Sequence, residues 1–85
     1  MARTIHDFKD ADIICHVMNG KMVLVRDGDD ITLIVENKVR YSNRTADGMK
    51  AYLLRVHANP EKSSLPADCK AHAKNLVWIW NNRAN

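Results

Sequence analysis

Ile13–Arg26, with the sequence IICHVMNGKMVLVR, places two apolar, β-branched runs on either side of the pair Asn19-Gly20. Asn and Gly both tolerate the positive φ that a type I′ turn requires at its two central positions, and the twist of that turn matches paired strands. Two such runs separated by exactly two turn residues are a strong local signal for a hairpin. The segment therefore predicts a β-hairpin with strands at 13–18 and 21–26.

Strand-like apolar runs continue beyond this hairpin. A turn-forming cluster of Asp and Gly at 27–30 leads into a third strand at 31–36. Asn37-Lys38 then turns the chain into a shorter strand at 39–42. These runs are apolar on both faces, so we expect a sheet that is covered on one face and partly shielded on the other.

The periodicity changes after residue 42. Apolar residues recur at the i, i+3, i+4, i+7 spacing of an amphipathic helix, at Met49, Tyr52, Leu53 and Val56. Thr45 or Asn43 is suited to cap its first turn, and Asn59-Pro60 ends it, because the residue before a proline avoids the helical region.

A second helix follows, for which the sequence predicts Ser64 as the cap and Pro66 in the first turn. Its apolar stripe consists of Leu65, Cys69, Ala73, Leu76 and Trp80.

We therefore expect an α+β fold in a single domain, 1–85. An antiparallel meander of three or four strands at about 12–42 precedes two helices at about 45–58 and 65–82, packed on one sheet face. A chain of 85 residues is too short for a doubly wound dinucleotide-binding sheet or an eight-fold barrel. Its core is small, since a domain of this size buries only about 60% of the surface that the unfolded chain exposes.

The charges are unevenly placed along the chain. Residues 1–37 carry a net charge of −3 and residues 38–85 a net charge of +6, which together give the overall +3. Such an asymmetry favours one positive surface, which suits nucleic acid or an acidic protein patch.

The end of the second helix carries more large apolar residues than one core can cover. Trp78 and Trp80 are two positions apart, about 200° around a helix, so they face nearly opposite ways. If Trp80 joins the core, Trp78 points outward, where a large aromatic side chain anchors a partner well. The predicted protein-binding residues are Trp78 and Ile79, together with the acidic turn residues Asp27, Asp29 and Asp30.

Nucleic acid is the alternative ligand. The basic residues of the second half are expected to form one phosphate-binding stripe over the fourth strand, where Arg40 shares a face with Ser42, and over the helices. The stripe comprises Arg40, Arg44, Lys50, Lys70 and Lys74. Aromatic residues are too sparse on the strands for a base-stacking sheet, and no helix-turn-helix or zinc-finger pattern is present.

Catalytic and metal-binding patterns are weak. The side chains Cys15, Cys69, His57 and His72 offer zinc-binding atoms, but their spacing matches no known finger or ribbon. No glycine-rich phosphate loop or activated nucleophile motif occurs. We therefore expect neither an enzyme nor a metal or cofactor site. The sequence has no signal-like or membrane-spanning apolar segment, which predicts a cytoplasmic protein with reduced cysteines.

The function that these features favour is a small non-enzymatic protein-binding protein. By analogy of size, it is a regulator or inhibitor of a larger macromolecular machine, as many phage or mobile-element accessory proteins are. Two alternatives are a nucleic-acid-binding module that uses the basic second half, and a homodimer formed through the Trp78 surface.

Overall fold

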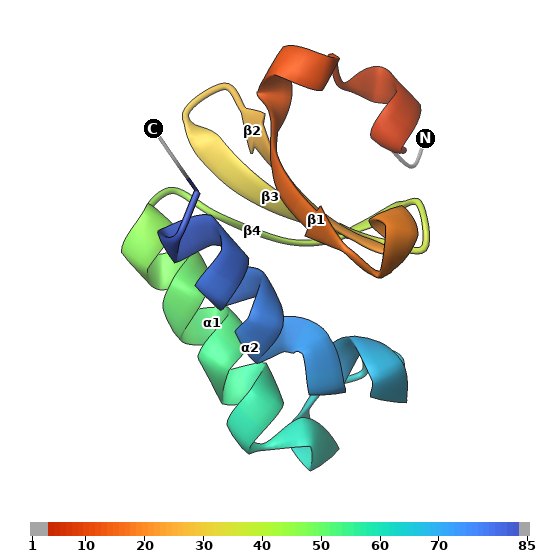
Figure 1. Ribbon diagram of the computed structural model, residues 1–85, viewed down its shortest axis with the longest axis vertical. Helices are drawn as coiled ribbons and strands as arrows, with labels where there is room; N and C mark the ends of the chain where they lie inside the picture. The colour runs from red at the N-terminus through yellow and green to blue at the C-terminus, as the bar shows by residue number, and fades with distance from the viewer. Residues whose placement is uncertain (1–3, 84–85) are drawn as a thin grey trace.

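A computed structural model of the chain describes residues 4–83; the ends of the predicted domain, 1–3 and 84–85, lie outside the described residues. Four strands pair in chain order, each antiparallel to the next, and two helices follow them (Figure 1). The fold is α+β, as the sequence predicts. The elements are β1 (Ile13–Val17), β2 (Met22–Asp27), β3 (Asp30–Val35), β4 (Lys38–Asn43), α1 (Ala46–Ala58) and α2 (Ala67–Asn81).

The turn between β1 and β2 has the predicted type I′ geometry. Asn19 has φ 56° and ψ 34°, Gly20 has φ 91°, and the Lys21 amide donates to the Met18 carbonyl at 3.1 Å. Met18 itself has φ 58°, which ends the strand at Val17. The strand predicted to reach Met18 is therefore one residue too long.

The two other turns also contain positive φ values. Gly28, with φ 62°, is the first central residue of the turn that pairs Asp27 with Asp30. Between β3 and β4, the central residues are Glu36 and Asn37, with φ 51° and 67°. The prediction of a turn at Asn37-Lys38 was wrong by one residue, because Lys38 already pairs with Val35.

Each edge strand contains one extra residue that disrupts the pairing register. In β1 the extra residue is Ile14, between the pairs Ile13↔Val25 and Cys15↔Leu24. In β4 it is Arg40, which lies between Val39 and Tyr41, the partners of successive β3 residues. A bulge re-aims the side chains around it.

The bulge overturns one sequence prediction about β4. Arg40 does not share a face with Ser42: Ser42 bonds Thr32 at 2.8 Å, whereas Arg40 reaches Ser64 on the connection between the helices. The extra residue therefore turns Arg40 toward the side of the sheet that the helices cover.

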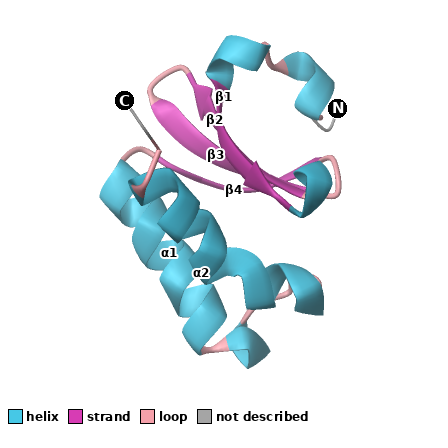
Figure 2. Ribbon diagram, in the orientation of Figure 1, coloured by secondary structure: helices cyan, strands magenta, loops and turns pink. Residues whose placement is uncertain are grey.

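Both helices pack on one face of the sheet, as predicted (Figure 2). Here β1 contacts α2, and β4 contacts α1. The core beneath the helices includes Leu24 and Leu33 from the sheet, Leu53 from α1 and Leu76 from α2, none of which has exposed surface. This cluster contains most of the buried apolar side chains among the described residues.

The opposite face is covered by the N-terminal segment, which forms two short 3₁₀ turns, Ile5–Asp7 and Asp10–Asp12. Ile5, Phe8 and Ile13 pack there against a small cluster of sheet residues, Val23, Val25 and Ile34. The Ile5 amide also donates to the Asn37 side chain at 2.9 Å. The expectation of a second, partly shielded face is confirmed, although the sequence did not identify what covers it.

The starts of the two helices differ. The Thr45 hydroxyl accepts from the Gly48 amide at 2.9 Å, which confirms Thr45 as the cap of α1. The predicted cap of α2 was wrong: no side-chain hydrogen bond caps this helix, and Ser64 accepts from Arg40 instead. The helix begins at Ala67 because Pro66 still has the extended ψ of 148°.

Candidate interaction surface

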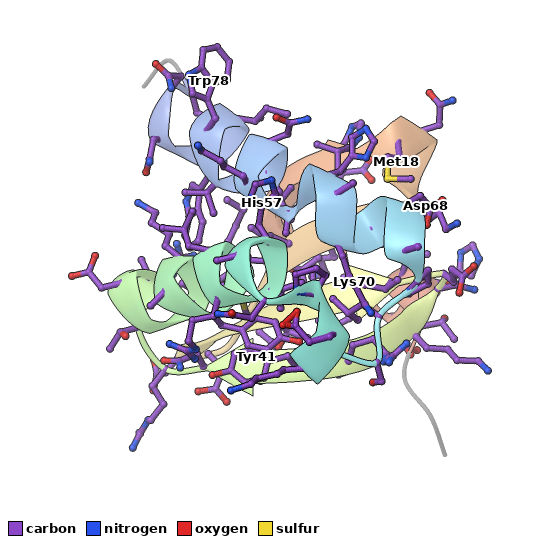
Figure 3. The ribbon with its side chains drawn as sticks, turned by 90° about the horizontal axis from the view of Figure 1, so that it is seen from below. Met18, Tyr41, His57, Asp68, Lys70 and Trp78 are labelled. Carbon is purple, nitrogen blue, oxygen red and sulfur yellow. The ribbon has the colours of Figure 1, made fainter. Side chains whose placement is uncertain are left out.

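Trp78 and Trp80 lie on different sides of α2, as their spacing predicts. Trp80 packs against the core beneath the helices, and the ammonium of Lys50 lies 4.7 Å from the centroid of its ring. Trp78 points away from the core and is 65% exposed. Figure 3 shows the Trp78 side chain projecting beyond the end of α2. The structure therefore confirms the outward placement of Trp78.

Ile79 contributes less to this surface than the sequence suggests. Its side chain is only partly exposed and packs against the core. The backbone around Trp78 is held by the end of the helix, since the Trp78 carbonyl accepts from both the amide and the side chain of Asn82, at 3.0 and 2.8 Å. Trp78 is thus presented on a supported backbone.

Two pairs of residues show how α1 and α2 lie against each other. Lys50, near the start of α1, contacts Trp80 near the end of α2. His57, near the end of α1, lines the same surface hollow as Lys70, near the start of α2. The helices are therefore antiparallel, and the middle of α1 is level with Lys74 on α2.

Leu54 lies in the middle of α1 and is 43% exposed. The sequence prediction missed it because Leu53 fills the core stripe, and the adjacent Leu54 then has no place in that stripe. A second leucine directly after a core leucine could therefore have predicted an exposed apolar side chain. We define the lysine–tryptophan surface as the outer side of the two helices that carries Lys50, Leu54, Lys70, Lys74 and Trp78.

The lysines of this surface are available for a partner. Among the described residues, Lys50, Lys70 and Lys74 have no acidic side chain within ion-pair distance, and the Lys50 ammonium lies over the Trp80 ring. The surface therefore combines one large exposed aromatic ring with unneutralised positive charge.

The predicted single stripe of basic residues was wrong. Arg40 donates to Ser64 at 2.9 Å on the β4 side of α1, where Tyr52 stacks on Tyr41. Tyr52 and Lys50 are two positions apart on α1 and so face opposite flanks of that helix. The helix therefore separates Arg40 from Lys50, Lys70 and Lys74, while Arg44 lies exposed in the connection between β4 and α1.

The acidic turn lies at the end of the sheet where α2 finishes. Asp27 and Asp30 pair across the turn between β2 and β3, and Asp29 is exposed at its tip. Ile31 pairs with Asn43, the last residue of β4, so α1 begins beside this turn and the antiparallel α2 ends there. Figure 1 shows the turn and the end of α2 on the same side of the molecule. The acidic turn and Trp78 thus lie at the same end of the fold, the turn in the sheet and Trp78 in the helix layer.

The two cysteines are free and buried. Burial raises the pKa of the Cys15 thiol to about 11 and also raises the pKa of Cys69. Both groups are therefore neutral thiols at physiological pH, a poor state for a nucleophile or a metal ligand. His72 contacts the Asp68 carbonyl at 2.9 Å. Within residues 4–83, no three His, Cys, Asp or Glu side chains gather in a metal-binding group.

One ion pair ties α2 to the first hairpin. The Lys21 ammonium lies 2.6 Å from Asp68 and 3.6 Å from Glu36. The hydrogen bond between Lys21 and Asp68 raises the pKa of Lys21 and lowers the pKa of Asp68. Asp68 is exposed and Lys21 is partly exposed, so the pair orients α2 rather than supplying much stability.

In the part of the chain that the structure describes, neither helix has the length and apolarity needed to span a membrane. No family model, curated protein or solved structure matches this chain.

Proposed function

We propose that this protein is a small non-enzymatic binding protein of the cytoplasm that docks on an acidic protein surface through the lysine–tryptophan surface. The observation that carries the proposal is the exposed indole of Trp78. Tryptophan is enriched among the residues that dominate interface energetics, and the Trp78 side chain is 65% exposed.

The positive charge beside Trp78 selects the kind of partner. Lys50, Lys70 and Lys74 favour an acidic surface, because complementary potentials accelerate encounter and exclude partners of like charge. Leu54 adds apolar area. A protein of this size that occupies an acidic patch on a larger machine would regulate or inhibit it by blocking access to that patch.

Capture of partners from a lysate of the source cell tests the proposal. The immobilised full chain is incubated with lysate that has been treated with nuclease, and washed at roughly 0.5 M salt, where exposed charge contacts are strongly screened. We expect a discrete protein to be retained after this wash and to be lost with Trp78→Ala, whereas Lys74→Glu should weaken its capture before the salt is raised. Its contact surface, once it is identified, should be acidic.

Val39→Ala is the matched control, because Val39 is another exposed apolar residue, 37% accessible, but lies on β4. Equal retention by the Trp78→Ala and wild-type proteins would contradict the proposal. Loss of all retained material after nuclease would favour the nucleic-acid alternative. A wild-type dimer in light scattering that Trp78→Ala converts to a monomer would instead favour a homodimer.

A further inference from the structure

A pocket of about 380 Å³ opens on the flank of α1 that faces away from the lysine–tryptophan surface. Its walls come from the last turns of α1 and from the connection that leads to α2. Figure 3 shows Trp78 and Tyr41, the ring on which Tyr52 stacks, on opposite sides of α1. The residues that matter for its chemistry are Tyr52, Arg55, Val56, Lys62, Ser63 and Ser64.

Three cationic side chains from three different elements meet at this pocket. Arg55 of α1 and Lys62 of the connection line it. Arg40 reaches its rim from the bulge in β4 and donates to Ser64 at 2.9 Å. Among the described residues, none of the three has an acidic partner within ion-pair distance. Like charges are thus held together without neutralisation.

The opposing negative charge at the pocket is smaller. The carbonyls at the end of α1 amount to about half an elementary charge, and one of them, that of Arg55, accepts from the Asn59 amide at 2.8 Å. Glu61 lines a different hollow, with His57 and Lys70. Three full positive charges outweigh these contributions, so the pocket attracts anions.

The hydroxyl groups add directed donors. Ser63 accepts from the Leu65 amide and Ser64 accepts from Arg40, which leaves each hydroxyl hydrogen available. The Tyr52 hydroxyl has no hydrogen-bond partner within residues 4–83, and its ring is fixed by stacking on Tyr41, with centroids 3.8 Å apart. Burial raises the pKa of Tyr52, although Arg40 and Arg55 oppose the shift, so this hydroxyl stays a donor.

We propose that this pocket binds a small phosphate monoester. The phosphoryl oxygens accept from the guanidinium groups of Arg40 and Arg55 and from the Lys62 ammonium, and the hydroxyls complete the donor set. Charge-assisted hydrogen bonds of this kind are the strong ones, and arginine suits the geometry of phosphate. This binding site does not depend on the function proposed for the lysine–tryptophan surface.

The size of the pocket favours a ligand larger than inorganic phosphate. Ligand pockets of roughly 300–1,000 Å³ hold small organic molecules, so inorganic phosphate would leave much of this one unfilled. Val56 and the Tyr52 ring provide an apolar wall for the organic part of the ester. A nucleoside monophosphate fits this description and serves as the probe.

Calorimetric titration of the full chain at fixed ionic strength tests the site. We expect adenosine monophosphate to bind, adenosine not to bind, and inorganic phosphate to compete. Arg55→Gln and Lys62→Gln should each lower the affinity for adenosine monophosphate by about tenfold or more, as expected when a charged hydrogen-bonding partner is removed. Tyr52→Phe, which retains the stacked ring, should weaken it by a smaller factor.

Lys74→Gln is the matched control, because it removes the same charge from α2, on the other side of α1 from the pocket, and should change the affinity by about twofold or less. The proposal is overturned if adenosine binds as tightly as its monophosphate, or if adenosine monophosphate does not bind. It is also overturned if Lys74→Gln weakens binding as much as Arg55→Gln, since attraction by net charge alone would then be the cause.

Discussion

The two faces of the sheet have equally buried residues but very different covers. Leu33 and Ile34 are neighbours on β3, with 0% and 1% exposure. Leu33 packs into the large cluster beneath α1 and α2, whereas Ile34 packs into the small cluster closed by Ile5, Phe8 and Ile13. Equal burial therefore does not by itself give two residues equal contributions to the free energy of unfolding. The depth and rigidity of the cover matter as well.

Truncation of each of the two β3 neighbours should show the largest difference between the two faces. We expect Leu33→Ala to lower the free energy of unfolding by about 4 kcal/mol and Ile34→Ala by about 2 kcal/mol. The short N-terminal segment can settle into the space that Ile34 leaves, but two packed helices cannot close over the loss of Leu33. Urea unfolding followed by tryptophan fluorescence measures both. Equal losses would show that the two covers are equally rigid.

Alkaline pH should lower the stability of the fold through a thiol buried on the helix-covered side. The Cys15 thiol, which contacts the Leu76 carbonyl at 4.0 Å, has a folded-state pKa of about 11 against an ordinary value of 9.0. Between these values only the unfolded chain loses the proton, so stability present below pH 9 falls as the pH rises toward 11.

This shift in pKa corresponds to a loss of at most about 3 kcal/mol. Urea midpoints between pH 8 and 11 measure the loss, and Cys15→Ala should flatten the decline. An unchanged decline in that variant would assign the effect to other groups, such as Cys69 and Tyr52, whose pKa values are also raised.

Phe8→Ala should measure how much the N-terminal cover contributes to stability. Phe8 is only partly buried, so its removal should cost about 1–2 kcal/mol, less than burial of a whole aromatic side chain contributes. Hydrogen exchange should also accelerate at the Ile5 amide, which bonds Asn37, before it does so in the helices. A loss as large as that for Leu33→Ala would mean that the N-terminal segment is an integral part of the main core.

The smallest effect is expected at the cap of α1. Thr45→Ala removes the acceptor for the Gly48 amide and should cost about 1 kcal/mol, whereas Thr45→Ser retains the hydroxyl and should cost less. Thermal unfolding monitored by circular dichroism compares the two. Equal losses would show that the methyl group of Thr45, and not its hydroxyl, stabilises the start of the helix.

The sequence predicts those parts of the fold that local rules determine. Asn19-Gly20 specifies a turn by its backbone preferences, and the spacing of Met49, Leu53 and Val56 specifies a helix. The same reasoning placed Trp78 outside, because the angle between positions two apart on a helix is fixed. Neither bulge was predicted, since an extra residue in an edge strand is determined by pairing with the neighbouring strand.

The remaining features depend on contacts between distant residues. The two short N-terminal turns carry too few residues for a periodic pattern, so their role as a cover was invisible. The prediction of a single basic stripe was wrong for the same reason, because only the packing of α1 shows that Arg40 and Lys50 lie on opposite flanks of this helix. The pocket beside Tyr52 brings together α1, the connection at Ser64 and, through Arg40, β4, which the linear order of residues does not reveal.

The two bulges also govern how the sheet meets other molecules. β1 and β4 are its edges, and an open edge is a template on which another chain can add a strand. At each edge the extra residue, Ile14 or Arg40, interrupts the regular ladder of backbone groups, and Lys38 and Arg40 place positive charge along β4. Growth of the sheet into a fibril or an edge-to-edge dimer is thereby disfavoured, which leaves side-chain contacts as the route to association.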